Sequence, residues 1–276
     1  MIDYHVHPDF SRDAQGSIED YCRRALEVGI EEICFTTHHE PDPAREALES
    51  VMVKGRQVAT DSDWPLEYFD EIEQARRKFP DIMIRSGVEI GYEMGIEGLV
   101  SDFLQSYRFD YVLGAVHSLD HIALTASSEL DEFRRRFGSE SAEFVVGRYF
   151  DYVRAAAGSK LFDCIAHLDV YRKYIQSLYG AEFGACARRL MRSVLEDIAR
   201  SGTGLEVNSS ALRRGDNEPY PALDIVKQAK ALGIPFFTIG SDAHRPDDLG
   251  VGLDRVARFL ANLGITPARF EARRRL

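Results

Sequence analysis

Short apolar runs alternate with amphipathic stretches along the chain. The runs are rich in β-branched and aromatic residues, which is typical of strands, and the stretches between them repeat apolar residues at helical spacing. The first such stretch begins at Ser17, a favourable N-cap residue, and ends at Gly29, a favourable helix stop. Strands are predicted at residues 3–7, 33–37, 82–89, 109–116, 161–166, 204–208 and 235–240. Helices are predicted between them, including residues 65–79, 142–157, 183–200, 221–232 and 253–263.

Two segments do not follow this alternation. Residues 40–63 have little periodicity and carry Pro41, Pro43 and Gly55, so we interpret them as a long loop over the site, of the kind that often forms a lid. Residues 118–140 are polar and mixed. Elsewhere strands and helices alternate without a linker or an internal repeat. The pattern therefore predicts an α/β fold, a single domain over residues 1–276 built as one parallel barrel or a closed relative of one.

Composition narrows the possible function classes. A length of 276 residues with 45% hydrophobic residues allows a sizeable core. No run approaches the roughly 18 apolar residues of a membrane span. The N-terminus has no basic and apolar leader, so we expect a cytoplasmic protein without membrane contact. The formal charge of -11 opposes loose binding to nucleic acid and favours a small substrate.

The cysteines do not form a recognisable metal or disulfide motif. Cys22, Cys34, Cys164 and Cys186 are far apart in the chain and include no Cys-x-x-Cys pair. We expect buried reduced thiols, so a metal would depend on histidine and carboxylate ligands. The three arginines at residues 273–275 are interpreted as a solvated tail without a role.

Side chains with metal-binding chemistry stand at the predicted strand ends. Side chains alternate across a strand, so His5 and His7 project to one face. In a parallel barrel all strand ends surround one mouth, where further polar residues would join them: His38, Glu89, His117, His167, Glu206, Asn208, Asp242 and His244. Histidine with carboxylate suits Zn, Mn or Fe, and these ligands exceed one tetrahedral site. We therefore expect two to three divalent transition metals that share a bridging carboxylate, an arrangement that favours hydrolytic displacement at phosphorus.

The complete set of motifs resembles the metal-ligand motifs of the PHP (polymerase and histidinol phosphatase) superfamily, in their usual order and over nearly the whole chain. These motifs are His5-Val6-His7, Thr36-Thr37-His38, Gly87-Val88-Glu89, His117, His167 and Ser241-Asp242-Ala243-His244. Residues 167–174 and 206–213 further resemble the histidinol-phosphatase branch. The resemblance implies a distorted (β/α)7 barrel, in agreement with the strands predicted from the hydrophobic pattern.

The resemblance also implies a trinuclear metal site. Its ligands, carried over motif by motif, are His5, His7, Glu89 and Asp242 for a first metal, Asp13, His38 and His244 for a second, and Glu89, His117 and His167 for a third. Asp13 departs from the pattern, because many relatives have a histidine at this position. A carboxylate is a harder ligand and would shift the preference toward Mn or Fe. Asp9 competes with Asp13 for this role, and the motif spacing favours Asp13.

Further residues are candidates for roles around the metals. Arg172 and Arg213 follow strand-end polar residues closely enough to overhang the mouth, and the planar arginine fork suits phosphate oxygens. Asp242 and His244 are candidates for the catalytic acid that protonates the leaving group. His39 and His121 are weaker candidates: the first would face away from its neighbour His38 if the strand continues, and the second would be solvated in a polar loop.

Three functions are compatible with these observations. The first is a metal-dependent phosphomonoesterase that hydrolyses L-histidinol phosphate, a step of histidine biosynthesis. The second is a PHP phosphoesterase that acts on nucleotides, oligonucleotide ends or other small phosphomonoesters; the acidic charge counts against nucleic-acid substrates. The third is a noncatalytic accessory domain of the kind that PHP modules form beside polymerases, which the complete set of ligands disfavours. The sequence leaves the oligomeric state open.

Overall fold

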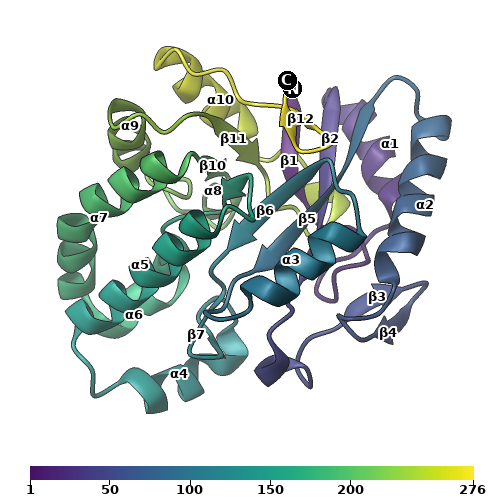
Figure 1. Cartoon of the computed structure of the whole chain (residues 1–276). Coiled ribbons are helices and arrows are strands. Elements are labelled where there is room, and N and C mark those ends of the chain that lie inside the picture. Colours follow the sequence, from purple (N-terminus) through teal and green to yellow (C-terminus); the bar gives the residue numbers. More distant parts are fainter.

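A rolled sheet of parallel strands forms the centre of the protein, whose computed structural model describes residues 1–276 (Figure 1). The strands are β1 (Ile2–Val6), β2 (Glu32–His39), β5 (Met83–Gly91), β6 (Tyr111–Ala115), β9 (Cys164–Ile165), β10 (Gly204–Asn208) and β11 (Phe237–Gly240). They are neighbours in this order, and every pairing between them is parallel. The predicted α/β fold with seven parallel strands is therefore confirmed.

The two edge strands of this sheet meet at their carboxyl ends. Val6 of β1 forms a parallel bridge with Ala243, just beyond β11. The amide of His7 donates to the carbonyl of Ala243 (2.9 Å), and the amide of Asp242 donates to the carbonyl of His5 (2.8 Å). The sheet is thus a nearly closed barrel, in agreement with the fold that the family resemblance implies.

Helices cover the outside of the barrel (Figure 1). They are α1 (Ile18–Val28), α2 (Trp64–Lys78), α3 (Glu97–Ser106), α4 (Leu130–Phe137), α5 (Ala142–Ser159), α6 (Ile175–Tyr179), α7 (Ala181–Ser201), α8 (Ser210–Arg213), α9 (Leu223–Ala231) and α10 (Leu253–Asn262). Four short 3-10 helices lie in the loops, at Pro43–Arg45, Ser127–Glu129, Val170–Lys173 and Pro246–Asp248. In α1 the side chains of Ser17 and Asp20 form a capping box, and Gly29 ends the helix with a left-handed φ of 74°. Both ends of this helix were predicted.

Strand lengths differ from the prediction where they affect the site. β2 continues through His38 and His39, and β5 continues beyond Glu89 to Gly91. By contrast, β9 has only two residues, Cys164–Ile165. The long strands pair residue by residue, and His38 is directly opposite Glu89. The pairing of β2 with β5 therefore fixes these two side chains as neighbours.

The two segments without alternation have their own structure. Residues 40–63 contain the hairpin of β3 (Val51–Val53) and β4 (Arg56–Val58), and residues 118–140 contain the hairpin of β7 (Ser118–Leu119) and β8 (Ile122–Ala123), followed by α4.

Arg45 joins these two segments. Its guanidinium donates to both oxygens of Glu129 (2.8 Å each), to Glu49 (2.7 and 3.0 Å) and to the carbonyl of His121 (2.9 Å). These bonds occupy all five guanidinium N–H groups. The start of segment 40–63 is thus a fixed wall, which argues against the free lid that its sequence suggested.

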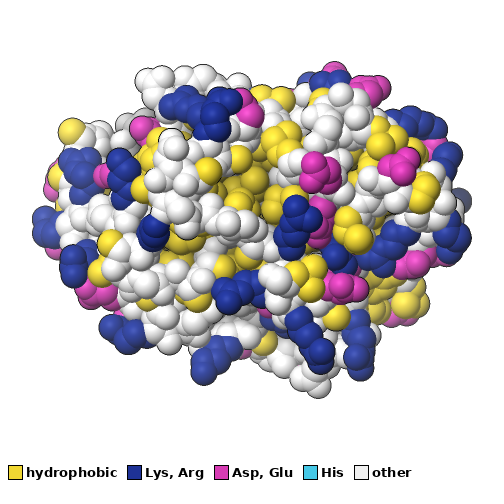
Figure 2. All heavy atoms as spheres, turned by 90° about the horizontal axis from the view of Figure 1, so that it is seen from above, with side chains coloured by type: hydrophobic (Ala, Val, Ile, Leu, Met, Phe, Trp, Pro, Cys, Tyr) yellow, Lys and Arg dark blue, Asp and Glu magenta, His cyan; other side chains and the backbone are white.

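The C-terminal residues form a hairpin at the amino end of the barrel. β12 (Phe270–Glu271) pairs with β13 (Arg274–Arg275), and the buried ring of Phe270 packs on Tyr4 and Tyr111. Both chain ends lie on this side of the molecule (Figure 1). Figure 2 looks onto this side and shows apolar side chains in its middle, with Lys and Arg side chains scattered around them.

Arg273 ties this hairpin to the barrel. Its guanidinium forms a salt bridge with Asp163 (3.1 Å) and donates to the carbonyl of Leu161 (2.8 Å). The expectation of a solvated tail is therefore wrong. Asp163 lies 110 residues away along the chain, so nothing near the three arginines in the sequence marks the contact.

Arg273→Ala is expected to lower the free energy of unfolding by about 1 to 3 kcal/mol, because the mostly buried Asp163 carboxylate loses its charged partner. Arg274, the exposed neighbour, provides a matched control: Arg274→Ala should change stability by less than about 0.5 kcal/mol. Urea unfolding followed by circular dichroism measures both. Equal losses in the two variants would contradict the role of Arg273.

Candidate metal centre

The carboxyl ends of the barrel strands bring histidines from distant parts of the chain around one carboxylate, Glu89. We call these histidines the histidine cluster: His5, His7, His38, His117, His167 and His244. His5 lies in β1 and His7 directly follows it, and His38 lies in β2. His117, His167 and His244 lie in the loops that follow β6, β9 and β11. Asp242 joins the cluster from the loop after β11, with Oδ1 3.5 Å from His7 Nε2.

The Glu89 carboxylate is the centre of this arrangement. Its oxygens lie 3.0 Å from His38 Nδ1 and His167 Nε2, 3.3 Å from His5 Nε2, 3.4 Å from His117 Nε2 and 3.5 Å from His7 Nε2. The side chain is 1% exposed. Burial by itself would raise the Glu89 pKa, but the surrounding imidazoles, His5 foremost, hold that pKa well below its ordinary value. The carboxylate therefore stays charged and faces ligand groups on several sides.

Several buried atoms of the cluster lie close to other ligand atoms, as His38 Nδ1 does to Glu89 Oε2, but make no hydrogen bond of suitable geometry. They are His5 Nε2, His7 Nε2, His38 Nδ1, His167 Nδ1 and Glu89 Oε2. Buried polar atoms in proteins are nearly always paired, and imidazole nitrogens and carboxylate oxygens are the atoms that coordinate transition metals. The donor set of the cluster therefore fits divalent metal ions.

The candidate ligand atoms fall into overlapping groups. The groups whose atoms lie within 4.8 Å of one another are His5, His7 and Asp242; His7, His38 and His244; His5, Glu89 and His167; and His38, Glu40 and His117. Because these groups share members, the arrangement can hold more than one metal. All four cysteines are free and buried, and none belongs to these groups, in agreement with the expected histidine and carboxylate chemistry.

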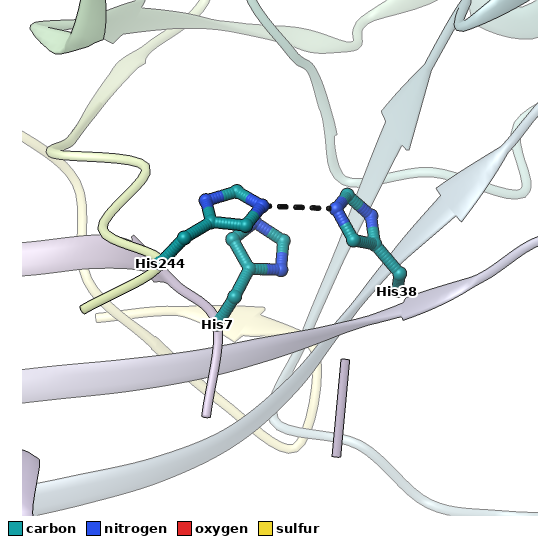
Figure 3. Close-up of side chains that lie close together, drawn as sticks. All are labelled: His7, His38 and His244. Atoms are coloured by element: carbon teal, nitrogen blue, oxygen red, sulfur yellow. Dashed lines mark hydrogen bonds between the residues drawn. The ribbon is translucent and has the colours of Figure 1, made fainter. Parts of the chain in front are cut away.

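His38 and His244 form the more exposed side of the cluster. Figure 3 shows their rings pointing toward each other, with the two Nε2 atoms 3.4 Å apart and His7 beside both. Burial lowers the His7 pKa well below its ordinary value, and the neighbouring imidazoles act in the same direction. A neutral imidazole is the form that binds metal. Asp13 stands at the outer edge, with Oδ2 3.3 Å from His244 Nε2 and Oδ1 3.9 Å from His38 Nε2.

Hydrogen bonds behind the cluster orient its rings. His5 Nδ1 lies 2.6 Å from Glu206 Oε1, which turns its other nitrogen into the cluster. His117 Nδ1 likewise lies 2.7 Å from Glu40 Oε1. Carboxylate partners of this kind fix the tautomer and orientation of metal-binding histidines. At Gly240 a Cβ would lie only 2.2 Å from the His5 Cβ and 2.5 Å from Glu206 Oε1, so the pair requires glycine there.

Two residues of the site have a left-handed backbone conformation. φ is 22° at His167 and 55° at Asp242. Such conformations cost a non-glycine residue roughly 1 to 3 kcal/mol and persist where the surroundings hold them. Around Asp242 this is done by Arg213, whose Nη1 and Nη2 donate to the carbonyls of Ser241 (2.9 Å) and Asp242 (3.0 Å).

A polar cavity of about 520 Å³ opens beside the cluster. Basic side chains that line it are Arg12, Arg45, Lys173 and Arg214, of which Arg45 is already paired with Glu49 and Glu129. Lys173 Nζ donates to the carbonyl of Thr125 (3.0 Å), and burial lowers the Lys173 pKa. Arg214 donates to the hydroxyl of Tyr220. The cavity thus places cationic groups next to the candidate metal ligands, a combination that suits an anionic ligand.

Arg172 and Arg213, which sequence reasoning singled out for phosphate, do not line this cavity. Arg172 Nη2 donates to the carbonyl of Pro219 (2.8 Å), and Arg213 donates to the two carbonyls described above. Guanidinium groups that are engaged by the main chain are not free to hold a phosphate, so the geometry does not support the expected clamp. Their sequence neighbours Lys173 and Arg214 face the cavity instead.

The weaker candidates lie outside the cluster. His39 is buried on the opposite face of β2, where its ring stacks on an aromatic ring of α3 (centroids 3.8 Å apart). Asp9 does not line the cavity, whereas Asp13 does. The half-exposed His121 is paired rather than simply solvated, because its Nδ1 lies 2.7 Å from Asp42 Oδ2.

Sequence reasoning missed Glu40, Lys173 and Arg214. Glu40 directly follows β2 and lies two positions after His38, so extending the alternation by one residue places it on the same face and could have revealed it. No comparable signal separates Lys173 and Arg214 from the basic residues that precede them.

Comparisons with known proteins agree with this geometry. A probable histidinol-phosphatase of Deinococcus radiodurans is 29% identical over 99% of this chain and 98% of its own length. The histidinol-phosphatase of Lactococcus lactis is 25% identical over 88% of this chain and 84% of its own. A solved structure of the Lactococcus lactis histidinol phosphate phosphatase, in complex with zinc, L-histidinol and phosphate, has a TM-score of 0.79 at 23% identity and covers 100% of this chain and 98% of that one. This likeness shows a shared fold.

The family itself follows from a match over most of the chain. The model of the PHP domain matches residues 3–210, which include all strands of the barrel except β11 and the candidate ligands from His5 to His167. None of the helices is both long and apolar enough to cross a membrane. The chain therefore belongs to the PHP domain family of metal-dependent phosphoesterases.

Proposed function

We propose that the protein is a phosphomonoesterase that hydrolyses L-histidinol phosphate to L-histidinol and phosphate in histidine biosynthesis. The observation that carries the proposal is the buried Glu89 carboxylate with imidazoles 3.0–3.5 Å away, beside a cavity lined by basic side chains. Relatives that match this chain over most of their length are named histidinol-phosphatases. The similar Lactococcus lactis structure contains zinc, L-histidinol and phosphate. These findings favour this substrate over other monoesters.

In this proposal the site holds two to three divalent ions of Zn, Mn or Fe. His5, His7, Glu89 and Asp242 would hold a first ion, Asp13, His38 and His244 would hold a second, and Glu89, His117 and His167 would hold a third. When bound, such ions polarise the phosphoryl group and make a water molecule acidic enough to lose its proton near neutral pH. Glu206 and Glu40, behind His5 and His117, hold the rings in the orientation that this binding requires.

The residues of the cavity wall perform the remaining work. Lys173 and Arg214 contact the phosphoryl oxygens and neutralise their charge. His244 Nδ1 donates to the carbonyl of Asp242 (3.1 Å), so its Nε2 faces Asp13 and the cavity. Asp242 and His244 both line the cavity, and each is a candidate for the acid that gives a proton to the leaving alkoxide only where it is not fully occupied as a metal ligand.

The two rival functions have less support. An accessory domain without activity has no need of a complete ligand set, whereas here the ligands implied by the family resemblance cluster around Glu89 or stand at its edge. A nucleic-acid substrate is disfavoured by the charge of -11. Both rivals are distinguished from the first hypothesis by one assay.

The substrate assignment is tested by phosphate release from a panel of phosphomonoesters. Metal-loaded protein should hydrolyse L-histidinol phosphate with a kcat/KM at least about tenfold above that for nucleoside monophosphates, because its pocket contacts select one leaving group. Chelation should abolish turnover and added Mn or Zn should restore it, with about two to three metal equivalents per chain by elemental analysis. Faster phosphate release from nucleotides than from L-histidinol phosphate would favour the second function. No phosphate release from any ester would favour the accessory domain.

The bridging role of Glu89 is tested by Glu89→Gln. The amide keeps the shape of the side chain but removes the charge that the surrounding groups share, so metal content should fall by more than one equivalent and kcat/KM by at least about 100-fold. Elemental analysis and steady-state kinetics measure the two effects. Glu31→Gln is the control, because Glu31 is 73% exposed and far from the site. Full metal content and activity in Glu89→Gln would remove this residue from the centre.

The phosphate contacts are tested by Arg214→Ala and Lys173→Ala. A charge-assisted hydrogen bond contributes roughly 1.5 to 3 kcal/mol, so each variant should raise KM for the monoester by about one to two decades. Arg192→Ala, at a helix position where the side chain is 72% exposed, is the matched control and should behave as the parent does. If both cavity variants stay within about twofold of the parent in kcat/KM, the phosphate is held by other groups.

A further inference from the structure

Two guanidinium groups pack against the ring of Tyr220. The Cζ atom of Arg172 lies 4.7 Å from the ring centroid, and that of Arg214 lies 5.3 Å from it. Contacts of this kind between a cation and an aromatic ring are favourable, and more so when water is excluded. Tyr220 is 1% exposed. Its ring therefore connects an arginine outside the cavity lining with one that belongs to it.

Arg172 is held in place by the protein itself. Its Nη2 donates to the carbonyl of Pro219 (2.8 Å), and its Nη1 lies 3.3 Å from Asp169 Oδ2. Asp169 is buried and also accepts from the amide of Ala222 (3.1 Å). Arg172 and Asp169 thus contact the chain on both sides of Tyr220.

Arg214 has different surroundings. It makes no salt bridge, and its side chain donates one hydrogen bond, to the hydroxyl of Tyr220. Arg214 and Tyr220 both line the cavity. A long side chain with so few contacts loses conformational freedom when it binds a ligand, unless a neighbour orders it beforehand. The Tyr220 ring and hydroxyl are the groups that can do so.

Tyr220 is also tied to the barrel. Its amide donates to the carbonyl of Asn208 (2.8 Å) and its carbonyl accepts from the Asn208 amide (2.6 Å). Asn208 is the last residue of β10, the strand whose Glu206 orients His5. The main chain therefore sets where Tyr220 lies relative to the histidine cluster, and the Arg172 guanidinium packs against its ring.

We propose that Arg172 is a positioning residue for phosphate binding, which holds the Tyr220 ring against which Arg214 is aligned. The inference rests on the proposed function, in which Arg214 contacts the phosphoryl group. Arg172 itself does not touch the substrate. Its effect on binding must therefore pass through Arg214.

A double-mutant cycle with inorganic phosphate as the probe tests this route. Parent, Arg172→Ala, Arg214→Ala and the double variant are compared as metal-loaded proteins, by calorimetric titration with phosphate and by phosphate inhibition of ester hydrolysis. Arg214→Ala should weaken phosphate binding about 10- to 100-fold, and Arg172→Ala should weaken it about five- to tenfold. The double variant should be within about twofold of Arg214→Ala alone, because residues that act as one unit are not additive. In turnover, Arg172→Ala should raise KM more than it lowers kcat.

Two results would overturn the inference. One is phosphate binding by Arg172→Ala within about twofold of the parent. The other is an additive double variant, which would mean that Arg172 acts on phosphate independently of Arg214 or through general loss of structure. If Arg172→Ala acted only through general loss of structure, it would lower metal content and kcat by the same factor in the parent and in the Arg214→Ala variant.

Further variants keep the test decisive if Arg172→Ala folds poorly. Tyr220→Phe keeps the ring and removes its hydroxyl, so phosphate binding should weaken severalfold in the parent but not in the Arg214→Ala background. Arg172→Lys keeps the charge without the fork and should restore only part of the loss. Arg192→Ala should match the parent. Unchanged phosphate binding in both Tyr220→Phe and Arg172→Lys would contradict the inference.

The same experiment separates this inference from the proposed function. If the parent binds phosphate but releases none from L-histidinol phosphate, the substrate proposal fails while the coupling between Arg172 and Arg214 is still measured. If Arg214→Ala binds phosphate as the parent does, the phosphate assignment of Arg214 fails, and the inference fails with it.

Discussion

A carboxylate that is withdrawn from water needs cations or hydrogen-bond donors around it, because burying its charge alone is very costly. Glu89 meets this need with imidazoles from distant parts of the chain, from His5 near the N-terminus to His167 beyond the middle. No local segment could supply them. The Glu89 charge is therefore compensated only when the barrel strands come together. The imidazole nitrogens that make no hydrogen bond indicate that metal ions bind beside this carboxylate.

Closure of the barrel also explains where the chain accepts unfavourable local structure. The bond between the Asp242 amide and the His5 carbonyl joins the last strand end to the first, and it does so with Asp242 at a φ of 55°. Arg213 holds the carbonyl on the other side of this residue. Gly240 removes the Cβ that would separate His5 from Glu206. Unfavourable backbone conformations thus occur where the geometry of the site requires them, and hydrogen bonds from neighbouring residues offset their cost.

The sequence was sufficient for the features that depend on periodicity. Alternation along a strand placed His5 with His7 and separated His38 from His39, and the helix limits at Ser17 and Gly29 followed from capping chemistry. It was insufficient where partners are remote, as for Arg273 with Asp163. The short β9 is another case, because its apolar residues would suit a longer strand while the barrel geometry pairs only Cys164 and Ile165.

The choice between adjacent basic residues shows the limit most clearly. Arg172 and Lys173 lie in one short 3-10 helix, and Arg213 and Arg214 lie at the end of α8. Successive residues in an α-helix differ in direction by roughly 100°, and in a 3-10 helix by roughly 120°, so a shift of one position turns a side chain from the main chain to the cavity. Sequence spacing locates the turn but not its rotation, which depends on tertiary contacts. In both turns the first basic residue holds the backbone and the second faces the cavity. Such a pairing lets an acidic protein present cationic groups to an anion: the arginine that is bound to carbonyls contributes rigidity, and its neighbour contributes an accessible charge.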